Sequence, residues 1–279
     1  MTLTINPLSE YFGSEAHGVD LTHALPDEEV ARLNQAFSER SVLVVRNQSL
    51  SPKEMLQAVQ LFGDVFEQHN KKFSLPECPE IHYIWNQDKF PDGTRYIPGE
   101  GYHTDHSNDQ TPPKATVLHA VKLPDSGGDT QFVNMAHAYE ELDTRTKNQI
   151  ADVQAVHVYQ ASRSTRKLMA VEGKNTAVME RSVTHPLVRT HPETGRKALY
   201  INPIRIESLV GVDDGEAPEL LDRLLEHATQ ERFQYHHKWQ PGDLVLWDNR
   251  CLLHKANGDY DHAQERYLLR VMLQGDKPY

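Results

Sequence analysis

The stretch WQPGDLVLWDNRCLLH, residues 239–254, says more about the fold than any other part of the chain. Pro241, Gly242 and Asp243 are a turn signal, and the apolar residues 244–247 indicate a short buried strand. A polar turn and a second apolar run then lead to His254. A lone histidine in such a setting is commonly a hydrogen-bonded interior residue. By itself, the stretch predicts a strand, a turn and a buried imidazole.

Similar patterns continue along the rest of the chain. Four amphipathic segments predict helices: residues 26–39 with Asp27 as N-cap, a segment from Ser51 and Pro52 to about Gly63, residues 136–151 and residues 217–229. Short strands are predicted at 41–46, 114–123, 130–133, 187–189, 198–201, 233–239 and 267–273. Residues 79–101 contain several Pro and Gly residues and predict a loop.

This order of elements points to one fold class. Many short strands separated by turns, with helices near the ends, predict an α+β protein that is mainly β. Its core would be a double-stranded β-helix (jelly roll) decorated with helices. The length suits a single domain, residues 1–279. Residues 160–182 are polar, basic and weakly periodic, and they are either an active-site loop or a variable surface loop.

Composition limits the possible partners. The chain is 38% hydrophobic and 25% charged, as globular proteins are, and its net charge of −11 argues against a nucleic-acid partner. The short basic clusters Lys71-Lys72 and 163–167 are interpreted as solvated surface. Nothing resembles a signal peptide or a membrane span, and Cys78 and Cys251 lack a disulfide or zinc spacing. We therefore expect a protein of the reducing cytoplasm with no membrane partner.

His103 and Asp105, together with His254, could form a metal site. Alternate side chains of an extended segment point the same way, so His103 and Asp105 can face one ion while Thr104 points away. Two imidazoles and one carboxylate on one face of Fe(II) leave the other face open for a co-substrate and O₂. The tripeptide alone would equally suit a surface turn with a solvated aspartate.

Two arginines and a threonine offer groups that could bind anions. Arg266 and Arg270 are four residues apart on a predicted strand, which places both on one face. Inside a barrel, such a pair would be costly without anions, whereas on an exposed edge strand it would need none. The turn Gly127-Gly128-Asp129 delivers the hydroxyl of Thr130 to a strand start, or it is a plain hairpin turn.

Together these features resemble the taurine dioxygenase and 2,4-dichlorophenoxyacetate dioxygenase family of Fe(II)/2-oxoglutarate enzymes. The resemblance covers most of the chain, in the same order and spacing. Its motifs are SVLVVR at 41–46, Phe62-Gly63, His103-Thr104-Asp105, PDSGGDTQF at 124–132, LVRTH at 187–191, WQPGDLVLWDNR at 239–250, His254, Arg266 and Arg270.

The resemblance implies an oxidoreductase and assigns roles by position. His103, Asp105 and His254 would bind Fe(II). Thr130 and Arg266 would hold the distal carboxylate of 2-oxoglutarate. The implied reaction uses O₂, releases succinate and CO₂, and oxidises, in the simplest case hydroxylates, an aliphatic C–H bond of a small carboxylate, sulfonate or amino acid. Relatives often form dimers or tetramers, which implies a homo-oligomer.

The resemblance places Arg270 at an anionic group of the substrate, but the rest of the substrate site departs from the taurine enzyme. That enzyme has Asn and Trp where this chain has Gly99 and Tyr102, which puts taurine itself in doubt. His69 is either a substrate contact or a surface residue. Tyr102 would line the site or pack in the core, and Glu100 could pair with a substrate ammonium group.

Other functions stay open at this point. The same iron site supports desaturation, cyclisation or C–N oxidation. A non-catalytic module that binds 2-oxoglutarate is a second alternative, although all three iron ligands are present. A zinc hydrolase would need a general base, for which Glu100 is the one candidate.

Overall fold

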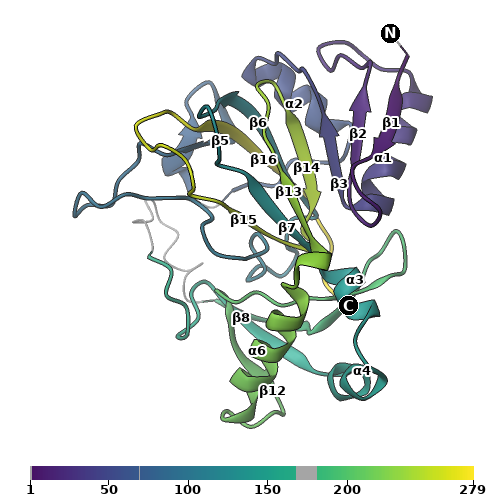
Figure 1. The fold of residues 1–279 in the computed structure, drawn as a ribbon, viewed down its shortest axis with the longest axis vertical. Helices are drawn as coiled ribbons and strands as arrows, with labels where there is room; N and C mark the ends of the chain where they lie inside the picture. The colour runs from purple at the N-terminus through teal and green to yellow at the C-terminus, as the bar shows by residue number, and fades with distance from the viewer. Residues whose placement is uncertain (1, 69, 168–180) are drawn as a thin grey trace.

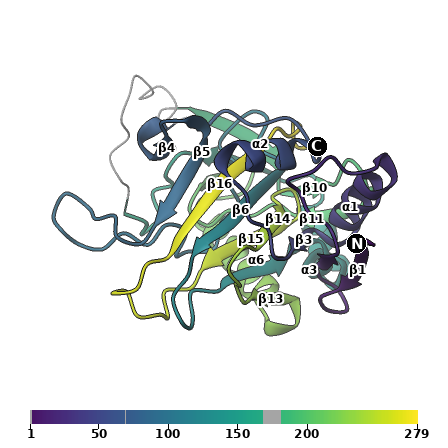
Figure 2. The ribbon, with the colours of Figure 1, turned by 90° about the horizontal axis from the view of Figure 1, so that it is seen from above.

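The computed structural model describes residues 2–68, 70–167 and 181–279, and its largest element is an eight-stranded sheet (Figures 1 and 2). The strands in spatial order are β1 (Thr4–Pro7), β2 (Ser14–His17), β3 (Val42–Val45), β14 (Leu244–Asp248), β6 (Ala115–Lys122), β16 (Tyr267–Leu273), β5 (Cys78–Trp85) and β4 (Ser74–Leu75). Neighbouring strands are antiparallel except β2 and β3, which are parallel.

Both faces of this sheet are buried, which explains why its central strands are apolar throughout. Successive residues of β3 and β14 belong alternately to two separate cores. The outer core is closed by α1 (Asp27–Arg40) and α2 (Pro52–Gln60), which contribute Leu33, Phe37, Met55 and Val59. The helices therefore cover one face of the sheet and leave the other for the second layer.

The inner core lies between the large sheet and a three-stranded sheet of β13 (Gln234–His237), β7 (Thr130–Asn134) and β15 (Leu252–Ala256). Val245 of β14 and Phe132 of β7 both belong to this core. Two facing, mainly antiparallel sheets with helices outside them confirm the expected mainly-β, jelly-roll class.

Smaller elements extend the inner core at the lower end of Figure 1. They comprise the sheet β12 (Ile206–Val210), β8 (Gln154–Val158) and β9 (Ser182–Pro186), the pair β10 (Val188–Thr190) and β11 (Lys197–Leu199), and the helices α3 (Met135–Glu140), α4 (Thr144–Ile150) and α6 (Glu216–Ala228). Two 3₁₀ turns, η1 (Lys71–Phe73) and η2 (Glu231–Phe233), complete the described elements. No helix among these residues is both long and apolar enough to cross a membrane.

The predicted loop at residues 79–101 is wrong in its first part. Most of β5 lies there, paired with β16 from Trp85 opposite Tyr267 to His82 opposite Arg270. Pro79 and the polar residue His82 disguise the strand, because they interrupt the apolar pattern that sequence reasoning depends on.

Two helix predictions also need correction, and one is confirmed. The single helix at 136–151 is divided into α3 and α4, because Asp143 accepts a hydrogen bond from the amide of Thr146 and caps a new helix. Asp27 is the first residue of α1, after an N-cap at Pro26 that makes no side-chain bond. The cap at Ser51 is confirmed as a capping box with Glu54. Of the expected active-site loop at 160–182, residues 168–180 lie outside the described residues.

Candidate active site

His103 and His254 lie side by side because their backbones form an isolated antiparallel bridge. The amide of His103 donates to the carbonyl oxygen of His254 at 3.0 Å, and the amide of His254 donates back at 2.9 Å. Side chains of directly opposite residues leave the same face of a ladder, and the two imidazole centroids are 4.2 Å apart. The bridge thus joins two histidines that are distant in sequence.

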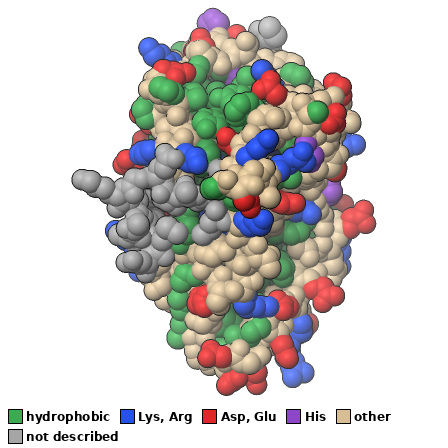
Figure 3. Space-filling model, turned by 90° about the vertical axis from the view of Figure 1, so that its left-hand side faces the viewer, with side chains coloured by type: hydrophobic (Ala, Val, Ile, Leu, Met, Phe, Trp, Pro, Cys, Tyr) green, Lys and Arg blue, Asp and Glu red, His purple; other side chains and the backbone are tan. Residues whose placement is uncertain are grey.

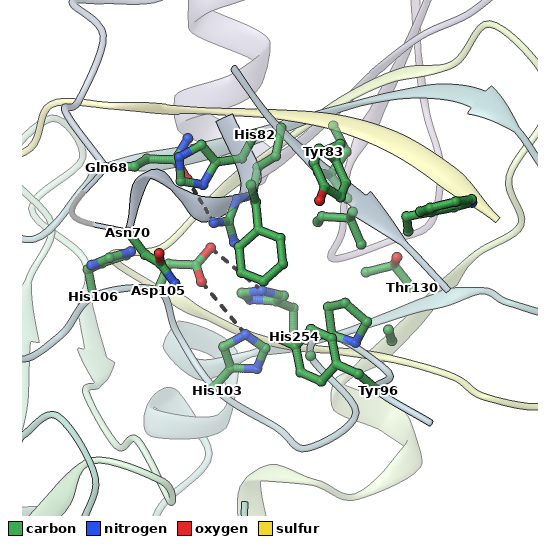
Figure 4. A pocket seen from close by; sticks show the side chains of 18 of the residues that line it. Gln68, Asn70, His82, Tyr83, Tyr96, His103, Asp105, His106, Thr130 and His254 are labelled. Carbon is green, nitrogen blue, oxygen red and sulfur yellow. Dashed lines mark hydrogen bonds and ion pairs between the residues drawn. The ribbon is translucent and has the colours of Figure 1, made fainter. Parts of the chain in front are cut away.

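The carboxylate of Asp105 faces both imidazoles (Figure 4). Its Oδ1 lies 3.7 Å from Nε2 of His103, and its Oδ2 lies 3.8 Å from Nε2 of His254. These separations are too long for hydrogen bonds, but they suit ligand atoms that each lie about 2.1 Å from one metal ion. The donor set and its spacing therefore fit a divalent metal.

The ionisation states of the three side chains also fit a metal. Nδ1 of His103 lies 2.7 Å from the carbonyl oxygen of Gly101, and a proton on Nδ1 leaves the Nε2 lone pair toward Asp105. Burial, and then His103, lower the pKa of His254 to about 3. Burial alone would raise the pKa of Asp105, but His254 and His103 outweigh it and lower that pKa below its usual range. Neutral imidazoles and an ionised carboxylate are the forms that bind metal.

Residues behind the ligands hold them in place. Thr104 points away from the site, as expected, and its hydroxyl donates to the carbonyl oxygen of Asn249 at 2.8 Å. Oγ1 of Thr116 on β6 donates to Oδ2 of Asp105 at 2.6 Å and accepts from Nδ2 of Asn249 at 2.9 Å. The ring of Trp247 lies 4.6 Å from that of His254. Asp105 and His254 are therefore oriented from the side of the large sheet.

Arg266 and Thr130 line the same pocket as the three candidate ligands. Arg266 is 5% exposed, its Nε donates to the carbonyl oxygen of Gly128 at 3.0 Å, and its Nη2 has no hydrogen-bond partner among the described residues. Burial lowers its pKa to about 10, which leaves the guanidinium charged near neutral pH. A Cβ on Gly128 would lie 3.2 Å from Cδ of Arg266, so the glycine leaves room for the arginine side chain. A buried cation with an unpartnered nitrogen suits a carboxylate ligand.

Arg270 leaves the same face of β16 as Arg266, as the spacing of four predicts. Leu268 between them belongs to the inner core. Nη2 of Arg270 donates to Oε1 of Gln68 at 2.7 Å, and its Nε has no partner among the described residues. His82, directly opposite on β5, is buried, and neither of its ring nitrogens has a hydrogen-bond partner in the part of the chain that the structure describes. Burial, followed by Arg270, lowers its pKa to about 3. Arg270 and His82 thus offer a second polar contact in the pocket.

The pocket has a volume of about 200 Å³, and several of its residues were missed by sequence reasoning. His82 was hidden by the wrong loop prediction. Arg166 belongs to the basic cluster at 163–167, and the interpretation of that cluster as solvated surface is wrong for Arg166, which lines the pocket. Arg205 also lines it, and the signal that could have identified this residue is a charge between Ile204 and Ile206.

Two of the predicted substrate contacts do not line this pocket, and a third lies outside the described residues. Glu100 is exposed and does not line it, so it does not supply the base that a zinc hydrolase would need there. Tyr102 lines a separate cavity and packs against the inner core, with Nζ of Lys255 4.8 Å from its ring centroid. The core alternative therefore describes Tyr102 better. His69 lies outside the described residues, although its neighbour Gln68 lines the pocket.

A second group of potential metal ligands, His191, Asp248 and Cys251, is already bonded internally. Nη2 of Arg250 lies 2.6 Å and Nε2 of His191 lies 3.0 Å from Oδ2 of Asp248. Because a guanidinium already occupies the carboxylate, we regard this group as a structural network.

Comparisons with known proteins agree with the geometry. The family model described as "Taurine catabolism dioxygenase TauD, TfdA family" matches residues 4–272. The chain belongs to this family. It is an Fe(II)- and 2-oxoglutarate-dependent dioxygenase, an oxidoreductase that uses O₂.

Individual relatives match this dioxygenase over nearly its whole length. An alpha-ketoglutarate-dependent 2,4-dichlorophenoxyacetate dioxygenase of Cupriavidus pinatubonensis is 33% identical, over 99% of each chain. The crystal structure of a taurine dioxygenase from Burkholderia xenovorans has a TM-score of 0.82 at 34% identity, over 99% of this chain and 92% of its own. AAD-2 in complex with Mn(II) and N-oxalylglycine has a TM-score of 0.83 at 29% identity, over 100% and 99%.

Proposed function

We propose that His103, Asp105 and His254 hold Fe(II), and that Arg266 and Thr130 hold the distal carboxylate of 2-oxoglutarate. The observation that carries this proposal is the placement of three ligand atoms around one point in the pocket that Arg266 and Thr130 also line. Thr130 is suited to its role because its Oγ1 accepts from Nε1 of Trp239 at 3.0 Å. The hydroxyl proton is then available for a carboxylate oxygen.

Bound Fe(II), with 2-oxoglutarate and O₂, supplies the oxidising power that converts an aliphatic C–H bond, in the simplest case to C–OH, with release of succinate and CO₂. The side chains position the reactants. Arg266 neutralises the distal carboxylate of 2-oxoglutarate. Arg270 neutralises an acid group of the substrate and thereby fixes which C–H bond lies near the metal.

The substrate we propose is a small organic anion. Arg270 supplies the charge, and the aromatic side chains Phe73, Tyr83 and Tyr96 supply an apolar wall for the organic part. The relatives named above carry the names of 2,4-dichlorophenoxyacetate and taurine, which both contain an acid group. Gly99 and the turned-away Tyr102 make taurine itself a poor candidate.

A substrate screen with an Arg270 variant tests this function. Succinate release would be measured with phenoxyacetates, alkanesulfonates and alkanoates. We expect Arg270→Met to weaken the apparent affinity for accepted substrates about tenfold or more, because a charge-assisted bidentate contact is lost. Arg163→Met removes an exposed arginine that pairs with Asp222 and serves as the matched control. Unchanged affinity of the Arg270 variant for every accepted substrate would remove Arg270 from the substrate site.

Product mass separates hydroxylation from the other outcomes that one iron site supports. Hydroxylation adds one oxygen atom, whereas desaturation or cyclisation removes two hydrogen atoms.

We further propose a cytoplasmic homo-oligomer, a dimer or tetramer, of single-domain chains. Size-exclusion chromatography with light scattering would contradict this assembly if it gave the monomer mass.

A further inference from the structure

Two arginines in the pocket have no role in the function proposed so far. Arg205 precedes β12, and Arg166 follows β8. Nη1 of Arg205 lies 2.8 Å and Nη2 of Arg166 lies 3.2 Å from the carbonyl oxygen of Tyr159. Both guanidiniums also lie over the Tyr159 ring, 5.2 and 5.8 Å from its centroid. Two positive charges thus converge on one uncharged residue.

Neither arginine forms an ion pair with any residue that the structure describes. Arg205 is only 6% exposed, and its Nε has no hydrogen-bond partner within the described chain. Burial, and then Arg166, lower the pKa of Arg205 to about 10, so it remains a cation near neutral pH. An unpaired buried cation is costly, and an anionic ligand in the pocket would relieve that cost.

The described side chains that line the pocket also carry more positive than negative charge. Its described lining contains four arginines (Arg166, Arg205, Arg266 and Arg270) but only two carboxylates, Asp88 and Asp105. Burial, followed by Arg270, lowers the pKa of the lining residue His82 to about 3, so this imidazole adds no charge. The two charges of Fe(II) and the two of 2-oxoglutarate cancel, so an excess of two positive charges remains among the described lining residues.

This excess is a local property of the molecule. The net charge of the whole chain is −11, and on the face in Figure 3 the Lys and Arg side chains are interspersed with Asp and Glu side chains. The two candidate anion contacts in the pocket also come from separate parts of the fold. Arg270 and His82 belong to the large sheet, whereas Arg205 and Arg166 flank the sheet that contains β8 and β12. A ligand that reaches both contacts would span the pocket.

We propose that the substrate carries two anionic groups, one held by Arg270 with His82 and the other by Arg205 with Arg166. A sulfonated carboxylate or a dicarboxylate has this chemistry. The planar guanidinium forks suit sulfonate and carboxylate oxygens, and two negative charges match the excess in the pocket. The inference rests on the proposed function, because it narrows the substrate class of the same site.

A pair of isosteric ligands tests the inference without any variant. 3-Sulfopropanoate carries two charges, whereas 3-sulfopropanamide has nearly the same shape and one charge. Binding of each would be measured by anaerobic calorimetry to the protein with Fe(II) and saturating 2-oxoglutarate. We expect the dianion to bind about tenfold more tightly or better. Equal affinities in the wild-type protein would overturn the proposal.

Variants then test whether Arg205 and Arg166 bind the second anionic group of the substrate. Arg205→Met and the less buried Arg166→Met should each reduce the preference for the dianion to about threefold or less, and Arg205→Lys should keep part of it. Arg163→Met, which alters an exposed ion pair, should keep the whole preference. A full preference in both Arg205→Met and Arg166→Met would overturn the assignment. An Arg205→Met variant that loses as much affinity for 2-oxoglutarate as for the dianion would also overturn the assignment. Arg205 and Arg166 would then bind the co-substrate.

Failure of the proposed function would look different. In that case the absorption band of an Fe(II)–2-oxoglutarate complex would be missing from the wild-type protein. The calorimetric preference for the dianion can still be measured in that protein, and its presence or absence decides the inference independently.

Discussion

Thr116 connects the candidate iron site to the strand behind it. Its single hydroxyl donates to Asp105 and accepts from Asn249, so each bond fixes the direction of the other. Because the hydroxyl donates its one proton to Oδ2 of Asp105, it holds this carboxylate oxygen in place. Partners of this kind commonly change metal affinity by 10–100-fold when they are removed.

Thr116→Val keeps the shape of the side chain and removes both hydrogen bonds. We expect Fe(II) affinity to fall by about 10–100-fold, because Asp105 loses its orientation and Asn249 loses an acceptor. Anaerobic Fe(II) titration in the presence of 2-oxoglutarate measures this. Thr184→Val on the exposed face of β9 is the control and should bind Fe(II) as the wild type does. Wild-type affinity in Thr116→Val would show that the hydroxyl does not orient the ligand.

The role and direction of a side chain could be predicted from sequence where the residue lies on a strand and its type suits one kind of ligand. Arg266 and Arg270 were predicted to share a face because strand periodicity fixes direction. Tyr102 and Glu100 could not be placed in the same way. They precede the metal motif in irregular backbone, where sequence gives no rule for side-chain direction.

At the scale of elements, the loop before His103 sets the position of the first imidazole. Gly99 has φ +79°, and its carbonyl oxygen accepts from the amide of Ala256 at 2.7 Å, close to His254. A Cβ at Gly99 would lie 3.3 Å from Cε1 of His103. The loop therefore fits only with a residue that tolerates left-handed backbone and adds no side chain.

Gly99→Ala should weaken Fe(II) binding, because the added methyl group presses on His103 and strains the loop. Gly93→Ala is a matched control, since Gly93 also has φ +79° but would meet no atom within 4 Å. We expect Fe(II) affinity to fall about tenfold or more in the first variant and to stay within about threefold in the second. Equal effects of the two substitutions would mean that crowding at His103 is unimportant.

Among the elements, β5 shows most clearly what sequence periodicity cannot reveal. The strand carries His82 inward because a ligand pocket, rather than an apolar core, lies on that side. A functional strand therefore loses the alternation by which strands are recognised. The break between α3 and α4 was missed for a simpler reason, since Asp143 acts as a cap inside a continuous helical pattern.

At the scale of the whole molecule, a buried ion network connects the two facing sheets. Asp248 ends β14, and the turn after it leads through Arg250 to β15 and His254. Arg250 donates to Asp248 and to Glu193, and His191 contacts the same aspartate. Burial alone would raise the pKa of Asp248, but Arg250 and His191 outweigh it and lower that pKa below its usual range.

Asp248→Asn should destabilise the protein by about 3–5 kcal/mol at pH 7, because buried Arg250 loses its buried anion and keeps only the exposed Glu193. Since the folded-state pKa is lowered, this stabilisation is complete above the unfolded value of about 3.9 and is lost as pH falls through the folded value. The difference from wild type should therefore shrink below about pH 4. Urea unfolding between pH 7 and pH 3 measures it, with exposed Asp222→Asn as the control. A difference that stays constant with pH would contradict the network's role.

The overall architecture was predictable because turns and strands alternate along the whole chain, and that pattern permits few folds. The pairing of His103 with His254 was not predictable from residues alone. The residue types suggested a shared metal site and the resemblance to a known family supported it, but the contact itself depends on a single backbone bridge between a loop and a strand.

The central claim is that His103, Asp105 and His254 form the iron site of a 2-oxoglutarate enzyme. The most direct test is anaerobic visible absorption of the metal-free protein as Fe(II) and then 2-oxoglutarate are added. A weak charge-transfer band that requires both additions, and that is absent from folded Asp105→Ala, is the predicted result. A well-folded wild-type protein that gives no band, or an Asp105→Ala variant that retains it, would contradict the claim.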